Sequence, residues 1–257
     1  MDLGLDGKRA LITGAGQGVG EGIARVLAEA GAHVVVNDLV EDRAAAVADA
    51  ITGAGGQASA AAFDVTDHDG VRAAIDACGP IDILVNNAGN AGADGWPGTV
   101  PFTETSPADW NVLLQVNLLG VMHCVHAVLP AMVEARWGRI ITVVSDAGRT
   151  GDAQLAVYGA AKAGAAGFSR GIAREVGRHG ITVNSVALGT MRTPLTEAFW
   201  DDPDHADRQR AMLRDYVVRR PGEVDDAAWT VAWLAAARSG WITGQTVPVN
   251  GGRSFAL

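Results

Sequence analysis

Residues 9–20 read RALITGAGQGVG, a short apolar run that enters a glycine-rich turn. Helical spacing of apolar residues follows from Ile23 to Ala30, and Gly31 ends it. The turn matches T-G-x-x-x-G-x-G, whereas the widespread G-x-G-x-x-G pattern fits none of its registers. Such glycines let the backbone turn sharply and let a pyrophosphate approach the N–H groups at a helix start. An ordinary turn is the alternative for the loop alone, but its place between a strand and a helix favours nucleotide binding.

Outward from this loop, strand-like runs alternate with longer helical patterns. Further strands are expected at 33–37, 57–63, 81–86, 139–144, 181–186 and 245–249, and further helices at 41–52, 67–78, 107–137, 153–179 and 225–237. The run Val34–Val36 is typical of a strand buried on both faces, and Pro130 is expected to bend or split the long helix. The alternation predicts one α/β domain over residues 1–257, doubly wound around a central parallel sheet of about seven strands flanked by helices.

Composition and charge exclude several classes of protein. The 257 residues are 48% hydrophobic, enough to bury a full core, which excludes a largely disordered chain. The net charge of −9 disfavours binding to nucleic acid or to an anionic membrane surface. Cys78 and Cys124 lie in apolar stretches and are expected to be reduced. With no signal peptide and no uninterrupted apolar run of about 20 residues, we expect a soluble cytoplasmic protein without a metal site, nucleic-acid partner or membrane association.

A carboxylate stands at the end of the second expected strand. Asp38 lies about 20 residues after the glycine loop, where an acidic residue can accept hydrogen bonds from the adenosine ribose. The same carboxylate would repel a 2′-phosphate, and positions 17 and 39 hold no Arg or Lys to compensate. The sequence therefore favours NAD over NADP. The alternative is that Asp38 only caps the helix beginning near Glu41.

Polar and small residues also end the third and fourth expected strands. Asp64 and Val65 follow the third strand and are expected beside the adenine. Residues 86–89, Asn-Asn-Ala-Gly, end the fourth strand and can line a cofactor channel with amides and small side chains. An ordinary polar turn is the alternative for this motif.

Tyr158 and Lys162 stand four residues apart and therefore share one face of a helix. By itself such a pair usually marks a solvated helix face. It becomes informative because Ser145 ends the fifth expected strand, 158 − 145 = 13 residues upstream. Ligands of parallel sheets bind at the carboxyl ends of the strands, where the glycine loop, Asp38 and Ser145 would meet.

With these residues in place, the chain resembles the short-chain dehydrogenase/reductase family, of the single-domain type, over essentially its whole length. The matching motifs are residues 13–20, Asn86–Gly89, Asn117, Ser145, Tyr158-x-x-x-Lys162, Gly189 with Thr193-Pro194, Thr243–Gln245 and Asn250–Gly252. The extended branch of the family carries T-G-x-x-G-x-x-G, which this loop does not match. One departure is Leu188-Gly189 in place of the usual Pro-Gly, which predicts a looser nicotinamide pocket because proline would stiffen that turn.

The resemblance implies a Rossmann fold, a nicotinamide cofactor, which Asp38 indicates to be NAD, and a proton-exchanging Tyr158. The ordinary pKa of tyrosine, near 10, makes it a poor base at neutral pH, and the Lys162 ammonium together with bound NAD⁺ would lower that pKa. Ser145 would hold the substrate oxygen, and Asn117 would position a proton-relaying water, the alternative being an Asn bonded to a helix carbonyl. The cofactor-binding residues that it implies are Gly14, Gln17, Gly18, Val19, Gly20, Asp38, Asp64, Val65, Asn87, Ala88, Gly89, Tyr158, Lys162, Gly189, Met191 and Thr193.

The substrate is the least determined part of this interpretation. Residues 195–220 correspond to the variable substrate lid of the family, which here includes several large apolar side chains: Phe199, Trp200, Met212, Leu213 and Tyr216. These side chains favour an apolar or extended substrate but could equally pack on the core, and Trp96 is expected to add a further wall. Residues 145–149 resemble family members that oxidise alicyclic hydroxyacyl thioesters. Arg149 or Arg192 would meet the phosphates of such a thioester, the alternative being ordinary surface arginines.

Several functions therefore stay open at this point. We expect hydride transfer between nicotinamide and a secondary alcohol or ketone, with alicyclic and 3-hydroxyacyl thioesters as candidate substrates. A 3-oxoacyl-thioester reductase is the nearest alternative, although its usual NADPH preference conflicts with Asp38. Sugar, polyol and steroid alcohols are not excluded, and a catalytically silent NAD-binding sensor is an alternative of another class. The resemblance also implies a homotetramer, formed through the long helix and the Tyr158 helix.

Overall fold

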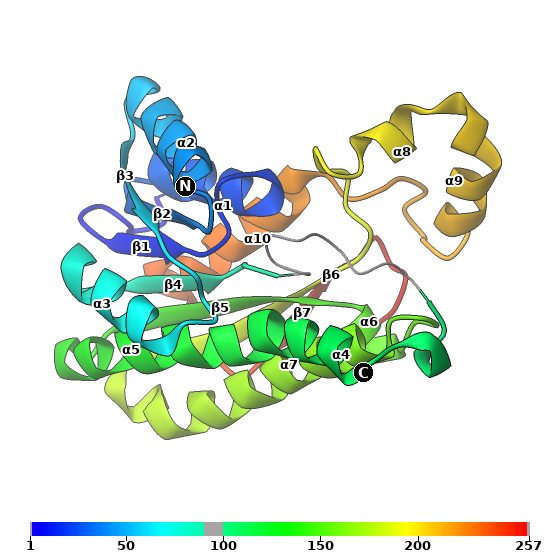
Figure 1. The fold of residues 1–257 in the computed structure, drawn as a ribbon. Coiled ribbons are helices and arrows are strands. Elements are labelled where there is room, and N and C mark those ends of the chain that lie inside the picture. The colour runs from blue at the N-terminus through cyan, green and yellow to red at the C-terminus, as the bar shows by residue number, and fades with distance from the viewer. Residues whose placement is uncertain (1, 90–99, 256–257) are drawn as a thin grey trace.

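A seven-stranded sheet with helices on both faces forms the body of the protein (Figure 1), a computed structural model that describes residues 2–89 and 100–255. The strands are β1 (Arg9–Ile12), β2 (His33–Asp38), β3 (Gln57–Ala62), β4 (Ile83–Asn86), β5 (Gly138–Ser145), β6 (Ile181–Leu188) and β7 (Thr246–Val249). They pair in the order β3-β2-β1-β4-β5-β6-β7, every pair parallel. This confirms the predicted sheet. The order reverses between β1 and β4, where doubly wound folds leave a ligand crevice.

Two sets of helices bury the two faces of the sheet. One face carries α1 (Gly18–Glu29), α2 (Glu41–Gly53) and α10 (Val224–Ala235); the other carries α3 (His68–Cys78), α4 (Pro107–Leu114), α5 (Gly120–Ala135) and α7 (Ala156–Val176). Side chains of a strand alternate between faces, so Ile12 joins the core under α1 and α10 while Leu11 joins the core under α5 and α7. All of these side chains are fully buried, which explains the continuous apolar runs of the inner strands.

The long helix is interrupted at a place that the sequence did not predict. A π-helical turn, Gln115–Leu119, separates α4 from α5, whereas Pro130 lies inside α5 without splitting it. The expectation of a split at Pro130 is wrong because Val128 and Met132, both almost fully buried, hold α5 on the sheet across the missing hydrogen bond. Single π turns are frequent at functional sites, and this one contains Asn117.

The predicted lid contains two short helices, α8 (Glu197–Asp201) and α9 (Ala206–Leu213), which stand off the body beyond the carboxyl ends of the strands (Figure 1). A one-turn helix, α6 (Ala147–Thr150), directly follows β5. The helix expected at 153–179 begins at Ala156 and ends in a 3₁₀ turn. Within residues 2–89 and 100–255, the 3₁₀ turns are Phe102–Glu104, Gly177–His179, Pro203–His205 and Ala237–Ser239.

The segment Pro107–Ala135 is apolar and long enough to cross a membrane by length and composition alone. In the fold it is a core helix, since Cys124 and Met132 are buried against the sheet. Less than half of its most apolar stretch is buried, so its outer side presents apolar side chains to the surface of the monomer. Both cysteines are free thiols, as expected.

Candidate active site

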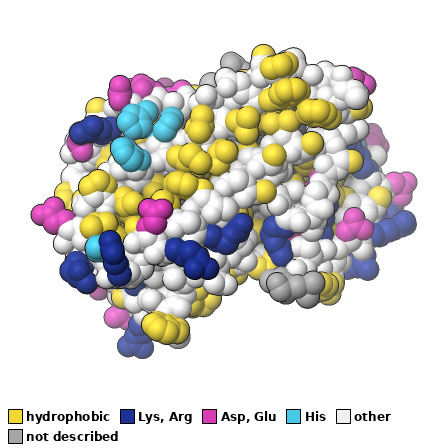
Figure 2. All heavy atoms as spheres, turned by 90° about the horizontal axis from the view of Figure 1, so that it is seen from below, with side chains coloured by type: hydrophobic (Ala, Val, Ile, Leu, Met, Phe, Trp, Pro, Cys, Tyr) yellow, Lys and Arg dark blue, Asp and Glu magenta, His cyan; other side chains and the backbone are white. Residues whose placement is uncertain are grey.

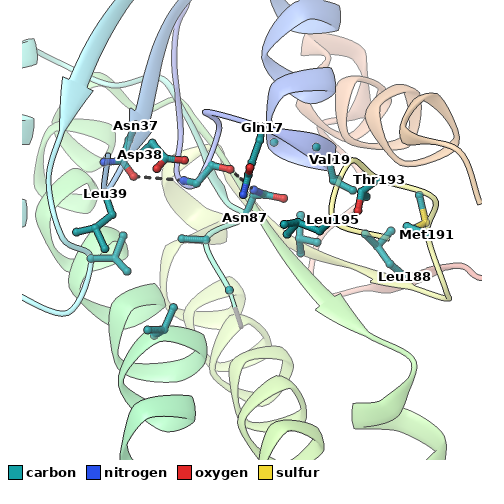
Figure 3. A pocket seen from close by; sticks show the side chains of 18 of the residues that line it. Gln17, Val19, Asn37, Asp38, Leu39, Asn87, Leu188, Met191, Thr193 and Leu195 are labelled. Carbon is teal, nitrogen blue, oxygen red and sulfur yellow. Dashed lines mark hydrogen bonds between the residues drawn. The ribbon is translucent and has the colours of Figure 1, made fainter. Parts of the chain in front are cut away.

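A cavity of about 510 Å³ opens at the carboxyl edge of the sheet, at the reversal between β1 and β4. Figure 3 shows Asn37 and Asp38 on one side of it, Gln17 and Val19 at the start of α1, and the segment after β6 on the other side. All sixteen residues that the sequence suggested for cofactor binding line this cavity, and so does Ser145. The catalytic candidate that does not line it is Asn117.

The glycine loop fits closely onto the end of β4. Gly14 and Gly18 adopt left-handed conformations, with φ of +61° and +60°, which side chains disfavour. A Cβ on Gly20 would lie 2.4 Å from the Gly14 carbonyl oxygen and 2.5 Å from Asn87 Nδ2. The Thr13 hydroxyl clasps the two loops by accepting hydrogen bonds from the backbone N–H groups of Asn87 (3.1 Å) and Ala88 (3.0 Å). The result is a bare backbone cradle of the kind that admits a pyrophosphate at a helix N-terminus.

Asp38 is almost fully buried at the end of β2, where it binds the glycine loop. Its Oδ2 accepts a hydrogen bond from the Gly16 N–H (3.1 Å), and its Oδ1 accepts one from the Val40 N–H (3.0 Å). A Cβ on Gly16 would lie 2.7 Å from Asp38 Oδ2, so this glycine, which the sequence analysis gave no role, lets the loop reach the carboxylate. The N-cap of α2 is Val40, without a side-chain cap, so the alternative that Asp38 caps this helix is wrong.

Arg43 is the charged residue of the cavity that sequence reasoning missed. It lies in the first turn of α2, lines the cavity and pairs with Asp38 at 2.7 Å between Nη2 and Oδ1. The prediction that no cation offsets the negative charge of Asp38 is wrong. Positions 17 and 39 hold no Arg or Lys, but the first turn of α2 brings Arg43 onto the carboxylate. About two fifths of the Arg43 side chain remains exposed, so its guanidinium is accessible to a ligand.

The residues expected beside the adenine lie at the Asp38 end of the cavity. Val65 is buried, and Asp64 is exposed and accepts hydrogen bonds from the backbone N–H and the hydroxyl of Thr66, both at 2.8 Å. Several further lining residues were not singled out by the sequence analysis as site residues: Asn37, Leu39, Val40, Phe63, Val116, Val143, Val144, Leu188, Pro194, Leu195 and Thr196. Most are apolar, and nothing in their spacing distinguishes them from core residues.

Ser145, Tyr158 and Lys162 come together at the other end of the cavity. Ser145 is the last residue of β5, and its side chain hydrogen-bonds that of Tyr158 in the first turn of α7. Lys162, one turn further along α7, is buried; its Nζ donates to the Val143 carbonyl oxygen at 3.0 Å and lies 5.8 Å from the centre of the Tyr158 ring.

Burial dominates the ionisation of this group. It lowers the pKa of Lys162 from 10.5 to about 8, because the ammonium loses its hydration. It also raises the pKa of Tyr158, and the opposing hydrogen bond from Ser145 is the smaller effect. Burial therefore outweighs the effects that favour the phenolate in the protein's own residues, and the lowering expected from Lys162 together with bound NAD⁺ stays a prediction. With a pKa of about 8, Lys162 is mostly protonated at neutral pH, so it is a buried cation that lines the cavity.

Asn117 lies behind this group rather than in the cavity. It is fully buried in the π-helical turn, and its Nδ2 donates to the Leu113 carbonyl oxygen at 2.9 Å, the contact that the alternative interpretation expected. A Cβ on Gly89 would lie 3.1 Å from both Asn117 Oδ1 and Lys162 Nζ. Gly89 therefore lies close to both side chains.

The segment after β6 lines the cavity and is hydrogen-bonded to the neighbouring backbone. Leu188 is the last residue of β6, and its carbonyl oxygen accepts a hydrogen bond from the Asp146 N–H at 2.9 Å. The Gly189 N–H donates to the Val249 carbonyl oxygen at 3.1 Å. The looser nicotinamide pocket predicted from the missing proline stays a prediction, because a proline at position 188 would leave both of these hydrogen bonds in place. Thr193 N–H donates to the Thr196 hydroxyl at 2.9 Å, which sets its place at the rim of the cavity.

The arginines considered for thioester phosphates are bound within the protein. Arg149 donates to Asp146 at 2.8 Å and to the Phe255 carbonyl oxygen at 3.1 Å, and Arg192 pairs with Asp201 at 2.5 Å. Of the lid aromatics, Tyr216 is buried and packs on the core. The proposed wall at Trp96 lies outside the described residues.

A glycine cradle at the reversal of a doubly wound sheet, followed along the strand ends by a Ser–Tyr–Lys group, defines a dinucleotide-binding oxidoreductase. The family model described as short chain dehydrogenase matches residues 8–204, and the chain belongs to this family. It is thus an oxidoreductase of CH–OH groups that binds a nicotinamide cofactor.

Three related proteins show the range of substrates among its relatives. The chain is 42% identical to a (2S)-[(R)-hydroxy(phenyl)methyl]succinyl-CoA dehydrogenase subunit, BbsD, of Thauera aromatica, covering 98% of this chain and 99% of that one. It is 38% identical to a 3-oxoacyl-[acyl-carrier-protein] reductase, FabG, of Vibrio harveyi, over 97% and 98%. Among solved structures, a gluconate 5-dehydrogenase of Burkholderia cenocepacia in complex with NADP and tartrate has a TM-score of 0.90 at 38% identity, over 100% and 98%.

Proposed function

We propose that this protein is an NAD-dependent dehydrogenase of a secondary alcohol carried by a hydroxyacyl thioester. One observation carries the proposal: the Ser145–Tyr158 hydrogen bond, with buried Lys162 behind it, lies in the same cavity as the Asp38 carboxylate. The proposal assigns proton transfer to the group at one end and ribose binding to the carboxylate at the other. The thioester is favoured by the similarity to BbsD, whose substrate is a CoA thioester of an aryl-bearing secondary alcohol.

Each residue has a distinct role in this proposal. When bound, the nicotinamide ring takes or gives the hydride. Tyr158 exchanges a proton with the substrate oxygen at its hydroxyl, and Ser145 donates a hydrogen bond to the same oxygen. Lys162 holds a positive charge near Tyr158 and favours the phenolate, offsetting the burial that raises the pKa of Tyr158. Asn117 and Lys162 both lie close to Gly89, and Asn117 would position the water that relays protons from Lys162.

NAD is the cofactor that this cavity favours, although the preference should be narrow. The Asp38 carboxylate has a lone pair left on Oδ2 for a ribose hydroxyl, since that oxygen accepts one protein hydrogen bond. The Arg43 guanidinium offsets part of the repulsion that Asp38 alone would exert on a 2′-phosphate. We therefore expect NAD to be preferred while NADP is still accepted.

The test of the proposal is nicotinamide absorbance with purified protein. NAD⁺ and NADP⁺ are offered in turn with cyclohexanol, a 7α-hydroxysteroid, gluconate and 3-hydroxybutyryl-CoA. Fastest reduction of NAD⁺ by the thioester supports the proposal. Fastest turnover of gluconate or of the steroid would replace the thioester as substrate class and leave the chemistry standing.

A 3-oxoacyl-thioester reductase is the second candidate, supported by the similarity to FabG and by the cation at Arg43. It predicts that acetoacetyl-CoA is reduced faster with NADPH than with NADH. A silent NAD-binding sensor would bind the cofactor and leave every alcohol of the panel unchanged. It has less support, because a sensor does not require the Ser145–Tyr158 hydrogen bond.

We also propose a soluble, cytoplasmic homotetramer. Figure 2 views the molecule from below and shows apolar side chains spread over this face. On α7 and around the π-helical turn, the partly exposed members include Leu118 and Phe168. A second copy of the chain would cover this surface, as the family resemblance implies, and so would explain why the long helix is apolar on its outer side.

A further inference from the structure

A buried carboxylate next to Ser145 has no role in the proposed chemistry. Asp146 follows Ser145 directly and is fully buried. Its Oδ1 accepts hydrogen bonds from Arg149 (2.8 Å) and from the Ser254 hydroxyl (2.8 Å), and its Oδ2 accepts one from Asn250 Nδ2 (2.9 Å). A carboxylate is taken out of water at high cost, so three charge-assisted bonds to one residue indicate a tightly specified position.

Two of these partners belong to the carboxyl-terminal turn, residues 250–255, which folds around the carboxylate. Asn250 Nδ2 also donates to the Ser254 carbonyl oxygen (2.9 Å), and Asn250 Oδ1 accepts the Gly252 N–H (3.0 Å). Arg149 donates to the Phe255 carbonyl oxygen (3.1 Å) as well as to Asp146. Asp146 thus joins a turn 104 residues away in the sequence to the end of β5.

On its other side, Asp146 adjoins the hydroxyl that contacts Tyr158. The Ala147 N–H donates to Ser145 Oγ at 3.2 Å, and Ala147 begins α6. A helix of four residues has almost no stability of its own, so the backbone that fixes this N–H needs an external anchor. The backbone bond from the Asp146 N–H to Leu188 O (2.9 Å) is one such anchor, and the Asp146 side chain, bound to the carboxyl-terminal turn, is a second.

We propose that Asp146 is a positioning residue, through which the carboxyl-terminal turn holds the Ser145 hydroxyl in hydrogen-bonding position for Tyr158. This inference rests on the proposed roles of Ser145 and Tyr158. It predicts that damage to the turn at Ser254 reaches the active site even though Ser254 does not line the cavity.

The chain has two tyrosines, Tyr158 and Tyr216, so protein labelled with ¹³C at tyrosine Cζ gives two resonances that Tyr216→Phe assigns. Ser145→Ala marks where the Tyr158 resonance moves when the Ser145 hydrogen bond is lost. Asp146→Asn and Ser254→Ala should move it towards the same position. They should also lower kcat for 3-hydroxybutyryl-CoA by about tenfold, with an unchanged Kd for NADH, because small misplacements of catalytic groups cost that much or more.

Arg253→Gln is the matched control, since Arg253 lies in the same turn but donates its hydrogen bonds to Asp152, and none to Asp146. Its Tyr158 resonance should stay at the wild-type position. If Asp146→Asn fails to fold, Ser254→Ala alone decides. Two results would overturn the role of Asp146 while the proposed function stands: a Tyr158 resonance at the wild-type position in Ser254→Ala, or a Tyr158 shift in Arg253→Gln as large as that in Ser254→Ala. Full activity of Ser145→Ala would overturn both.

Discussion

Lys162→Met should stabilise the folded protein while it abolishes catalysis. Burial lowers the pKa of Lys162 from 10.5 to about 8, so folding with a charged Lys162 costs about 3 kcal/mol, at about 1.4 kcal/mol per pH unit. Methionine has a similar length and pays no such cost. Loss of the Val143 hydrogen bond offsets part of the gain, so we expect the free energy of unfolding to rise by about 1–3 kcal/mol at pH 7.

The pH dependence identifies the cause. Between pH 8 and 10.5 the unfolded wild type binds a proton that the folded protein has lost, so wild-type stability rises with pH relative to the variant. The increase in the free energy of unfolding caused by Lys162→Met should therefore be largest below pH 8 and vanish near pH 10.5. Urea unfolding at fixed protein concentration measures it at pH 7 and 9.5.

Lys8→Met is the control for this measurement, because it loses an ion pair with Asp82 at 3.0 Å and gains no relief from burial. It should be neutral or slightly destabilising. A Lys162→Met protein that is less stable than wild type at pH 7, or whose advantage does not change with pH, would refute the assignment of burial cost to Lys162.

Three further predictions concern the cofactor and the assembly. Asp38→Ala should lower the ratio of kcat/KM with NAD to kcat/KM with NADP, and Arg43→Ala should raise this ratio. The wild-type ratio in both variants would mean that the Asp38–Arg43 pair is purely structural. Gly20→Ala should lose NADH binding by fluorescence titration, since its Cβ would lie 2.4 Å from a carbonyl oxygen, whereas Gly53→Ala meets no atom within 4 Å and should be neutral or stabilising by about 0.5–1 kcal/mol. Light scattering should show a tetramer that Phe168→Glu dissociates, and a stable wild-type monomer would contradict the proposed assembly.

Most of the fold was predictable because local patterns and the sheet agree. Three patterns predict the same parallel sheet: the Val34–Val36 run, the glycine turn, and the alternation of strands with helices. Each of them is compatible with few folds. The interruption of the long helix was not predictable. Pro130 is a strong local signal that packing on the sheet overrides, while the π turn at 115–119 has no recognisable sequence signature.

The candidate site was predictable where its residues follow strand ends, since topology alone brings Asp38 and Ser145 to one edge. Arg43 was also predictable, because it lies in the first turn of the helix that follows Asp38 and so faces the same strand end. The contact of Asp146 with Ser254 spans 108 residues and depends on the fold of a terminal turn, which no local pattern encodes. Burial, which sets the pKa of Lys162, is likewise a property of the packed protein.

The most direct test of the proposed chemistry is Tyr158→Phe, which removes one oxygen atom and keeps the ring in place. Turnover of the best alcohol of the panel and the Kd for NADH are measured side by side with wild type. The account predicts that kcat falls by about a hundredfold to ten-thousandfold while the Kd for NADH stays unchanged, because Tyr158 transfers a proton and the rest of the cavity binds the cofactor. Turnover close to wild type would remove Tyr158 from the mechanism and contradict the account.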